Sequence, residues 1–172
     1  MKLKPVEAEK LLRKYVKDES VVKHCLMVGK VAWKIANNLR KKGYLIDPEL
    51  AMVGGILHDL GRARGKPSHA FKGAEILRNE GYPDYARFCE THGFVVEEAK
   101  YLGLPGNYEP KTLEEKVVVY ADFRVKKDKV VSLDEKFRYL KRIYADVSEW
   151  ILEGEKRIRK LEEELTNDLN DI

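Results

Sequence analysis

The sequence predicts an all-α protein, a bundle of about seven or eight helices. Apolar residues recur at spacings of three and four along most of the chain, and no segment shows the apolar and polar alternation of a half-buried strand. Cap residues, prolines and glycines lie where these periodic segments begin and end. A chain of 172 residues is large enough to bury a core without disulfide bonds.

The first part of the chain is expected to form three helices before a basic loop. Each has its own start signal: Pro5 at a first helical position, Ser20 as an N-cap, and Asp47 as an N-cap followed by Pro48. The second helix is apolar nearly all round in its first half, which is typical of a buried helix. The expected spans are residues 5–17, 21–42 and 48–58.

The remainder is expected to form shorter helices and then a long helical tail. Ser68 and Thr112 are caps, and Ser132 begins a capping box. We divide the chain into a core, residues 1–130, and a C-terminal helical extension, residues 131–172, packed on the same domain. The expected helices cover residues 69–80, 83–92 and 95–101, a stretch from residue 113, and a tail from residue 133 that breaks near Ser148.

Composition narrows the class of protein. Apolar residues make up 44% and charged residues 36%, without low-complexity tracts, which is typical of a soluble globular protein. Cys25 and Cys89 lack Cys-x-x-Cys spacing, so we expect neither a disulfide framework nor a zinc knuckle, but a cytoplasmic protein. No apolar run is long enough to span a membrane. With 33 basic and 29 acidic residues, the charge permits an anionic ligand, but we do not expect nucleic acid as a partner.

His58 and Asp59 are the strongest chemical signal in the chain. His58 falls on the apolar stripe of its helix, and burying the neighbouring carboxylate costs several kcal/mol unless it is paired or bound to a cation. His24 and Asp122 also lie on apolar helix faces. A common metal ion would satisfy all four groups, and Mn, Fe, Co, Ni or Zn suit such ligands. A hydrogen-bonded core histidine beside a helix-terminal aspartate is the alternative.

The order of these residues resembles the HD superfamily of metal-dependent phosphohydrolases. His24, followed by Cys-Leu-Met-Val-Gly-Lys-Val-Ala, is similar to the first motif of the family, His58-Asp59-Leu-Gly to the second, and Asp122 in Tyr-Ala-Asp-Phe-Arg to the last. The resemblance covers roughly residues 20 to 126. It implies an all-helical domain with a His-His-Asp-Asp metal site that hydrolyses phosphate esters or anhydrides.

Two further histidines resemble those of binuclear members of this superfamily. The segment that begins at His69, together with His92, implies a second metal, with Asp59 as the bridge. As alternatives, His69 occupies the first turn of a helix, and His92 stabilises a helix C-terminus as a cation. The tripeptide at residues 81–83, Gly-Tyr-Pro, is similar to the one that names the HD-GYP phosphodiesterases, but no His-His pair precedes it, so we interpret it as a turn.

The implied reaction is hydrolysis of a phosphate ester or anhydride in a nucleotide or a related small phosphate compound, with one or two divalent transition metals. Asp59 and His58 are the catalytic candidates, with Asp59 both ligating metal and orienting water. Four basic residues near the motifs are candidates for binding phosphate, although each singly is also compatible with a solvated surface charge. They are Arg62, Arg64, Lys66 and Arg124.

Two other interpretations stay open from the sequence. The domain is alternatively a nucleotide-sensing regulatory module without turnover, whose helical tail relays to a partner. RNA binding by the basic loop is the interpretation with the weakest support, because that loop lacks the interleaved aromatic residues on which bases stack. The partner we expect is therefore a small phosphorylated substrate, and the apolar stripe of the tail also allows a homodimer.

Overall fold

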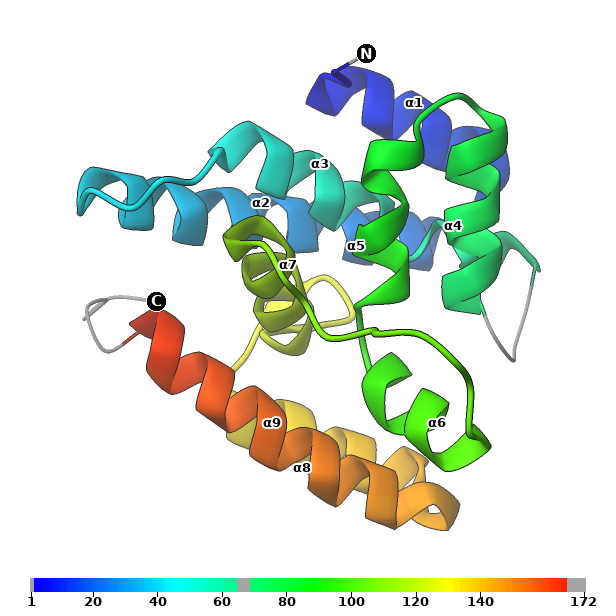
Figure 1. Ribbon diagram of the computed structural model, residues 1–172, viewed down its shortest axis with the longest axis vertical. Helices are drawn as coiled ribbons and strands as arrows, with labels where there is room; N and C mark the ends of the chain where they lie inside the picture. Colours follow the sequence, from blue (N-terminus) through cyan, green and yellow to red (C-terminus); the bar gives the residue numbers. More distant parts are fainter. Residues whose placement is uncertain (1, 65–68, 167–172) are drawn as a thin grey trace.

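The computed structural model describes residues 2–64 and 69–166, and this part of the chain is almost wholly helical (Figure 1). The predicted all-α class is confirmed, with nine α-helices in the described residues rather than seven or eight. They are α1 (Pro5–Tyr15), α2 (Glu19–Lys41), α3 (Pro48–Leu57), α4 (His69–Asn79), α5 (Ala86–Glu90), α6 (Val95–Leu102), α7 (Leu113–Phe123), α8 (Leu133–Ile143) and α9 (Ser148–Thr166).

Three short 3-10 helices and a small hairpin complete the described part. The 3-10 helices are η1 (Leu60–Arg64), η2 (Pro83–Tyr85) and η3 (Ala145–Val147). The hairpin pairs β1 (Val125–Lys126) with β2 (Lys129–Val130) in antiparallel register. Strands of two residues are too short to show alternation in the sequence, which is why no strand was predicted.

The predicted helix over residues 83–92 is wrong in its extent. The structure divides it into η2 and α5, and α5 ends at Glu90. Side chains bind the backbone just beyond that end: the Thr91 hydroxyl donates to the Arg87 carbonyl at 2.8 Å, and Nδ1 of His92 contacts the Cys89 carbonyl at 2.6 Å. His92 therefore lies in the turn between α5 and α6 instead of closing a helix.

The centre of the fold is the packing of α2 against α3, with α7 against both (Figure 1). Glycine permits a close backbone approach here, because a Cβ added to Gly55 would lie 2.8 Å from Cα of Gly29. The N-cap of α3 is Asp47, as predicted, whereas α2 is capped by Asp18 rather than Ser20. The close crossing brings the ends of α2 and α3 that carry His24 and His58 together.

The C-terminal extension packs on the rest of the protein through α9, which lies beside α6, α7 and α8 (Figure 1). A partly buried ion pair holds it: Arg157 donates to both carboxylate oxygens of Glu97, at 2.7 and 3.0 Å, and to the Gly93 carbonyl at 3.0 Å. The predicted break near Ser148 is confirmed, because η3 and the start of α9 fall there. The division into core and extension stays a prediction.

Candidate metal centre

Six histidine and aspartate side chains, from several parts of the chain, meet in one place. His24 comes from α2, His58 caps the end of α3, Asp122 is near the end of α7, and His69 begins α4. Asp59 and His92 follow α3 and α5. Two groups have ligand atoms within 4.8 Å of one another: His24, His58 and Asp59, and Asp59, His69 and His92. Asp59 belongs to both groups, so it lies between two candidate metal positions.

Backbone carbonyls fix the orientation of three imidazoles. Nδ1 of His58 donates to the Gly55 carbonyl at 2.6 Å, and Nδ1 of His92 donates to the Cys89 carbonyl at 2.6 Å. Nδ1 of His24 donates to the Lys127 carbonyl at 2.7 Å. Because a carbonyl only accepts, Nδ1 carries the proton and Nε2 of the neutral ring directs its lone pair to the centre. This is the tautomer in which a histidine binds metal through Nε2.

The hairpin supplies the carbonyl for His24 through an uncommon backbone conformation. Lys127 has a φ of 56°, the only positive φ of a non-glycine residue in the described part of the chain. A side chain in this left-handed region costs roughly 1 kcal/mol. The turn between β1 and β2 thus directs the Lys127 carbonyl at the imidazole of α2.

The carboxylates of Asp59 and Asp122 contact the Nε2 atoms of the four imidazoles. Asp122 Oδ1 lies 2.9 Å from Nε2 of His24 and 3.4 Å from Nε2 of His58. Asp59 Oδ1 lies 3.0 Å from Nε2 of His92 and 3.2 Å from Nε2 of His69. All five distances in this network, including 3.7 Å between Asp59 Oδ2 and Nε2 of His58, are short enough for one cation to contact several ligands at once.

Two buried atoms at the centre lack a hydrogen-bond partner of acceptable geometry among the described residues: Nε2 of His58 and Oδ1 of Asp59. His58 is 0% exposed and Asp59 4%, so water contact is minimal. An unpaired buried polar group costs about 1–3 kcal/mol, and more when it is charged. A divalent cation would satisfy both atoms, and imidazoles with carboxylates fit Mn, Fe, Co, Ni or Zn.

The electrostatics of the centre favour a cation. Burial raises the pKa of the Asp59 carboxyl, but His58 and the close imidazoles of His69 and His92 outweigh it and hold the pKa well below its ordinary value. Burial also raises the pKa of the Asp122 carboxyl. The nearby imidazoles, His58 foremost, outweigh this effect and hold that pKa well below its ordinary value. For His69, burial dominates and lowers the pKa of the imidazole. Both carboxylates are therefore ionised while His69 is neutral near pH 7.

The basic residues predicted to bind phosphate do not all lie at the centre. Nε of Arg62 donates to Oδ2 of Asp59 at 3.0 Å, so its guanidinium lies at the centre. Lys66 and the side chain of Arg64 lie outside the described residues. The structure does not bring Arg124 to the site: it donates to the Val131 carbonyl at 2.6 Å and to the Tyr120 hydroxyl at 2.7 Å. Its role is to tie α7 to the end of the hairpin.

A cavity of about 820 Å³ opens beside the centre. Its lining includes side chains of α6, α8 and α9 together with five residues of the centre, namely His24, Asp59, His69, His92 and Asp122. Sequence reasoning missed three cations of the wall, Lys23, Lys127 and Lys136. Lys23 precedes His24, so its position was a usable signal, whereas Lys136 reaches the cavity only because α8 folds back over the core.

The fold and the site place the chain among all-helical proteins with a histidine and aspartate cluster suited to a divalent metal. The HD domain family model matches residues 21–123, well over half of the chain. The chain therefore belongs to the HD domain family, whose members bind divalent metals. The expected resemblance is confirmed.

Several proteins are similar in sequence. An uncharacterised protein of Methanocaldococcus jannaschii, MJ0778, is 44% identical over 138 residues, which are 76% of this chain and 82% of that protein. The tRNA (cytidine(56)-2'-O)-methyltransferase of Picrophilus torridus is 36% identical over 90% of this chain and 45% of its own length. The Ribonuclease Y of Acidothermus cellulolyticus is 35% identical over 46% of this chain and 16% of its own length.

The chain thus spans most of the Methanocaldococcus protein but less than half of the methyltransferase and a small part of the ribonuclease. No solved structure matches the chain. Among the described helices, none is both long and apolar enough to cross a membrane.

Proposed function

We propose that the protein is a metal-dependent phosphohydrolase that cleaves a phosphate ester or anhydride in a nucleotide or related small phosphate compound. The observation that carries this proposal is the position of Asp59, shared by two groups of ligand atoms at the wall of an open cavity. His24, His58, Asp59 and Asp122 would hold one ion, and Asp59, His69 and His92 a second. A divalent ion in such a centre activates water for attack on phosphorus and stabilises charge on the phosphoryl oxygens.

The chain's own residues prepare this chemistry. Ionised Asp59 is oriented by Arg62, which leaves its buried Oδ1 directed at the centre, where it would ligate the metal and orient a water by accepting a hydrogen bond. The guanidinium of Arg62 and the ammonium of Lys136 line the cavity and would bind the phosphate oxygens. The Nδ1 hydrogen bond of His58 fixes its Nε2 as a ligand and prevents the ring from turning away.

The aromatic side chains of the cavity suit a nucleotide rather than phosphate alone. Phe94, Tyr139, Tyr144 and Trp150 line the cavity together with Ile143. Aromatic and aliphatic side chains of this kind contact the faces of a base, while the metal and the cations contact its phosphates. A cavity lined by both apolar and charged side chains therefore supports a substrate with both parts.

A phosphodiester bond of RNA is the second candidate substrate. It is favoured by the sequence similarity to a ribonuclease and to a tRNA methyltransferase, since both proteins are named for action on RNA. The chain covers less than half of the methyltransferase, and methyl transfer is not part of the proposal. The alternative to an enzyme is a regulatory domain that binds a nucleotide without turning it over.

The test is a turnover screen with a matched inactive variant. Nucleoside mono-, di- and triphosphates, bis(p-nitrophenyl) phosphate and a short RNA are incubated with protein loaded with Mn, Co, Ni, Fe or Zn. We expect hydrolysis of at least one compound, and its loss in Asp59→Asn, which keeps the shape of the side chain but removes its charge. Nucleotide binding without turnover of any compound under all five metals would favour the sensing module and overturn the proposed activity.

A further inference from the structure

The longest stretch of the sequence without an acidic residue is rich in basic residues. Residues 20–46 contain six Lys and Arg residues and no Asp or Glu. Because the whole chain carries 33 basic and 29 acidic residues, its remainder is slightly negative. The stretch that covers most of α2 and the loop after it is therefore strongly basic, although the net charge of +4 looks unremarkable when counted over the whole chain.

Four of these cations form a straight row on α2. Lys23, Lys30, Lys34 and Lys41 are separated by seven, four and seven residues, so with 3.6 residues per turn they fall within about 20° of one line along the helix. All four are exposed, and none forms an ion pair with a carboxylate in the described parts of the chain. The row is about 27 Å long at 1.5 Å per residue. We define it as the α2 lysine row.

The row begins at the cavity of the candidate metal centre. Lys23 lines that cavity, and the next residue is the ligand candidate His24. Lys127 lines the same rim from the hairpin, which packs beside α2. At its other end the row reaches the loop after α2, which extends away from the body of the molecule (Figure 1). From Lys23 to the end of α2 no acidic residue interrupts the cations, whereas at the cavity itself Glu19 and Asp128 lie among the lining residues.

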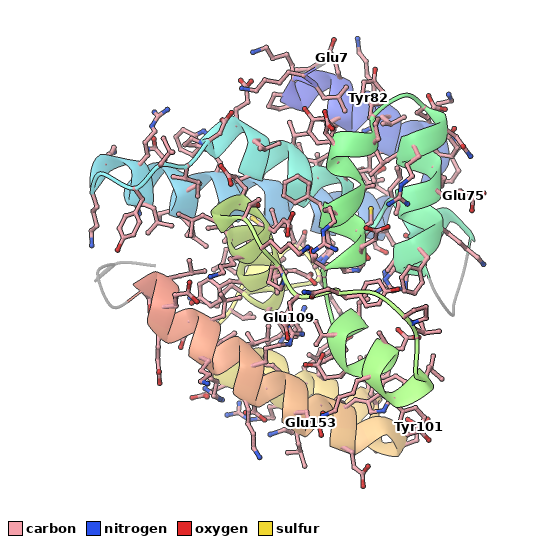
Figure 2. All side chains as sticks on the ribbon, in the orientation of Figure 1. Glu7, Glu75, Tyr82, Tyr101, Glu109 and Glu153 are labelled. Atoms are coloured by element: carbon pink, nitrogen blue, oxygen red, sulfur yellow. The ribbon has the colours of Figure 1, made fainter. Side chains whose placement is uncertain are left out.

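Acidic side chains project from other elements. The labelled Glu7, Glu75 and Glu153 extend outward from α1, α4 and α9, whereas nitrogen-tipped side chains extend from the free end of α2 (Figure 2). Trp33 lies on α2 beside the lysine row and is 45% exposed. An exposed indole next to a row of cations is the combination that contacts a base and its neighbouring phosphates.

We infer that the α2 lysine row binds a single RNA strand and leads its end into the cavity. This rests on the proposed function, in particular on its second candidate substrate. A polymer with a phosphate in every unit can contact the lysines one after another and still place one phosphodiester at the metal centre. An anionic membrane fits less well, because the apolar face of α2 is buried against α3 and α7 and has nothing to insert.

The experiment measures binding without turnover. A fluorescein-labelled single-stranded RNA of twelve or so nucleotides is titrated in EDTA, and anisotropy gives its affinity across a salt series. The row variant Lys30→Glu/Lys34→Glu/Lys41→Glu avoids the cavity. The matched control Lys10→Glu/Lys156→Glu/Lys160→Glu has the same net charge but changes exposed lysines of α1 and α9. A neutral row variant, with Gln at residues 30, 34 and 41, covers the case in which charge reversal disturbs folding.

We expect the charge-reversed row variant to lose at least tenfold in affinity, and the control less than threefold. Each phosphate contact in single-stranded RNA contributes about 0.7 to the slope of log affinity against log salt, so the neutral variant should lower that slope by about 2. Hydrolysis of bis(p-nitrophenyl) phosphate by the metal-loaded row variants should match the wild type. That measurement separates failure of the row from failure of the proposed function.

Three outcomes would overturn the assignment. The first is no RNA binding by the wild type at 50 mM salt, and the second is equal weakening by the row and control variants. The third is a preference of at least tenfold for another polyanion, namely DNA of the same sequence or vesicles containing phosphatidylserine. The last result would assign the row to that partner instead.

Discussion

The Nε2 atoms of His69 and His92 face each other at 3.0 Å, and both also contact Oδ1 of Asp59, at 3.2 and 3.0 Å. Nδ1 of His92 donates to a carbonyl, so its Nε2 offers a lone pair when the ring is neutral. Two imidazole nitrogens and an ionised oxygen that converge in this way need either a shared proton or a metal ion between them. The geometry is that of a ligand set for one ion.

This relationship predicts that His69 and His92 act as a unit. His69→Ala and His92→Ala should each lose the second metal ion and keep the first, and activity should fall by a similar factor in both. The double variant should be little worse than either single one, because both ligands serve one ion. Metal content per chain and kcat are measured on the same preparations. Independent, multiplicative losses of activity would instead favour a mononuclear enzyme.

Asp59→Ala should reduce metal content more than any other single change. Asp59 belongs to both groups of ligand atoms, so its removal weakens both positions. Elemental analysis of purified wild type and variant gives the stoichiometry, and His69→Ala is the comparison that should lose only one ion. Retention of metal at the wild-type level in Asp59→Ala would contradict the assignment of the centre.

Metal removal should lower the stability of the wild type. The ligands come from α2, α3 and α7, so binding free energy adds to folding free energy, by about 2.7 kcal/mol when free metal is a hundred times Kd. For a domain of this size, that corresponds to roughly 5–10 °C in melting temperature. Calorimetry with and without chelator measures it. Asp122→Ala should show a smaller chelator effect, and an unchanged wild-type melting temperature would refute the link.

Gly55→Ala should destabilise the protein by about 1–3 kcal/mol, because the added Cβ meets the backbone of Gly29 and neither helix can yield by turning a side chain. The forced separation of α2 and α3 should also weaken metal binding at His24 and His58. Urea unfolding and metal titration test both effects. Lys30→Ala, on the exposed side of α2, is the control and should change stability by less than about 0.5 kcal/mol.

The contribution of the Asp47 carboxylate to the free energy of unfolding should depend on pH. Burial raises the pKa of its carboxyl, but hydrogen bonds from Lys2 and from the first amides of α3 outweigh it, so the pKa lies below the ordinary 3.8. A lowered folded pKa means that the charge stabilises fully above this ordinary value and that its contribution is lost as pH falls through the folded pKa.

Asp47→Ala should therefore cost about 1 kcal/mol near pH 7, chiefly through the lost N-cap. Asp47→Asn, which keeps a capping oxygen, should cost only a few tenths, because the ion pair with Lys2 is exposed. The difference between wild type and Asp47→Asn should be lost as the pH falls through the folded pKa of Asp47. Denaturant unfolding from pH 7 to 2.5 measures this difference in stability. A difference that increased as the pH fell would contradict the prediction.

Sequence reasoning reached the ligand candidates because their signal is local: a histidine or aspartate on an apolar helix face requires a partner inside the protein. It did not predict the position of the Arg124 side chain, because closeness to Asp122 in the sequence does not show in which direction that side chain points. The side chain is held by the Val131 carbonyl and the Tyr120 hydroxyl, and the first of these depends on the hairpin. The aromatic wall of the cavity was also out of reach, since it depends on α8 and α9 folding back over the core.

The Lys127 carbonyl that fixes His24 comes from a residue 103 positions further along the chain, and Asp122 is 98 positions further. During synthesis, His24, His58, Asp59, His69 and His92 leave the ribosome well before either of these groups exists. A nascent chain therefore carries five of the six side chains without the carbonyl and carboxylate that orient the first of them. The ligand group around His24 becomes complete only after the hairpin has emerged, so any metal ion that needs the whole group can bind only at a late stage of translation.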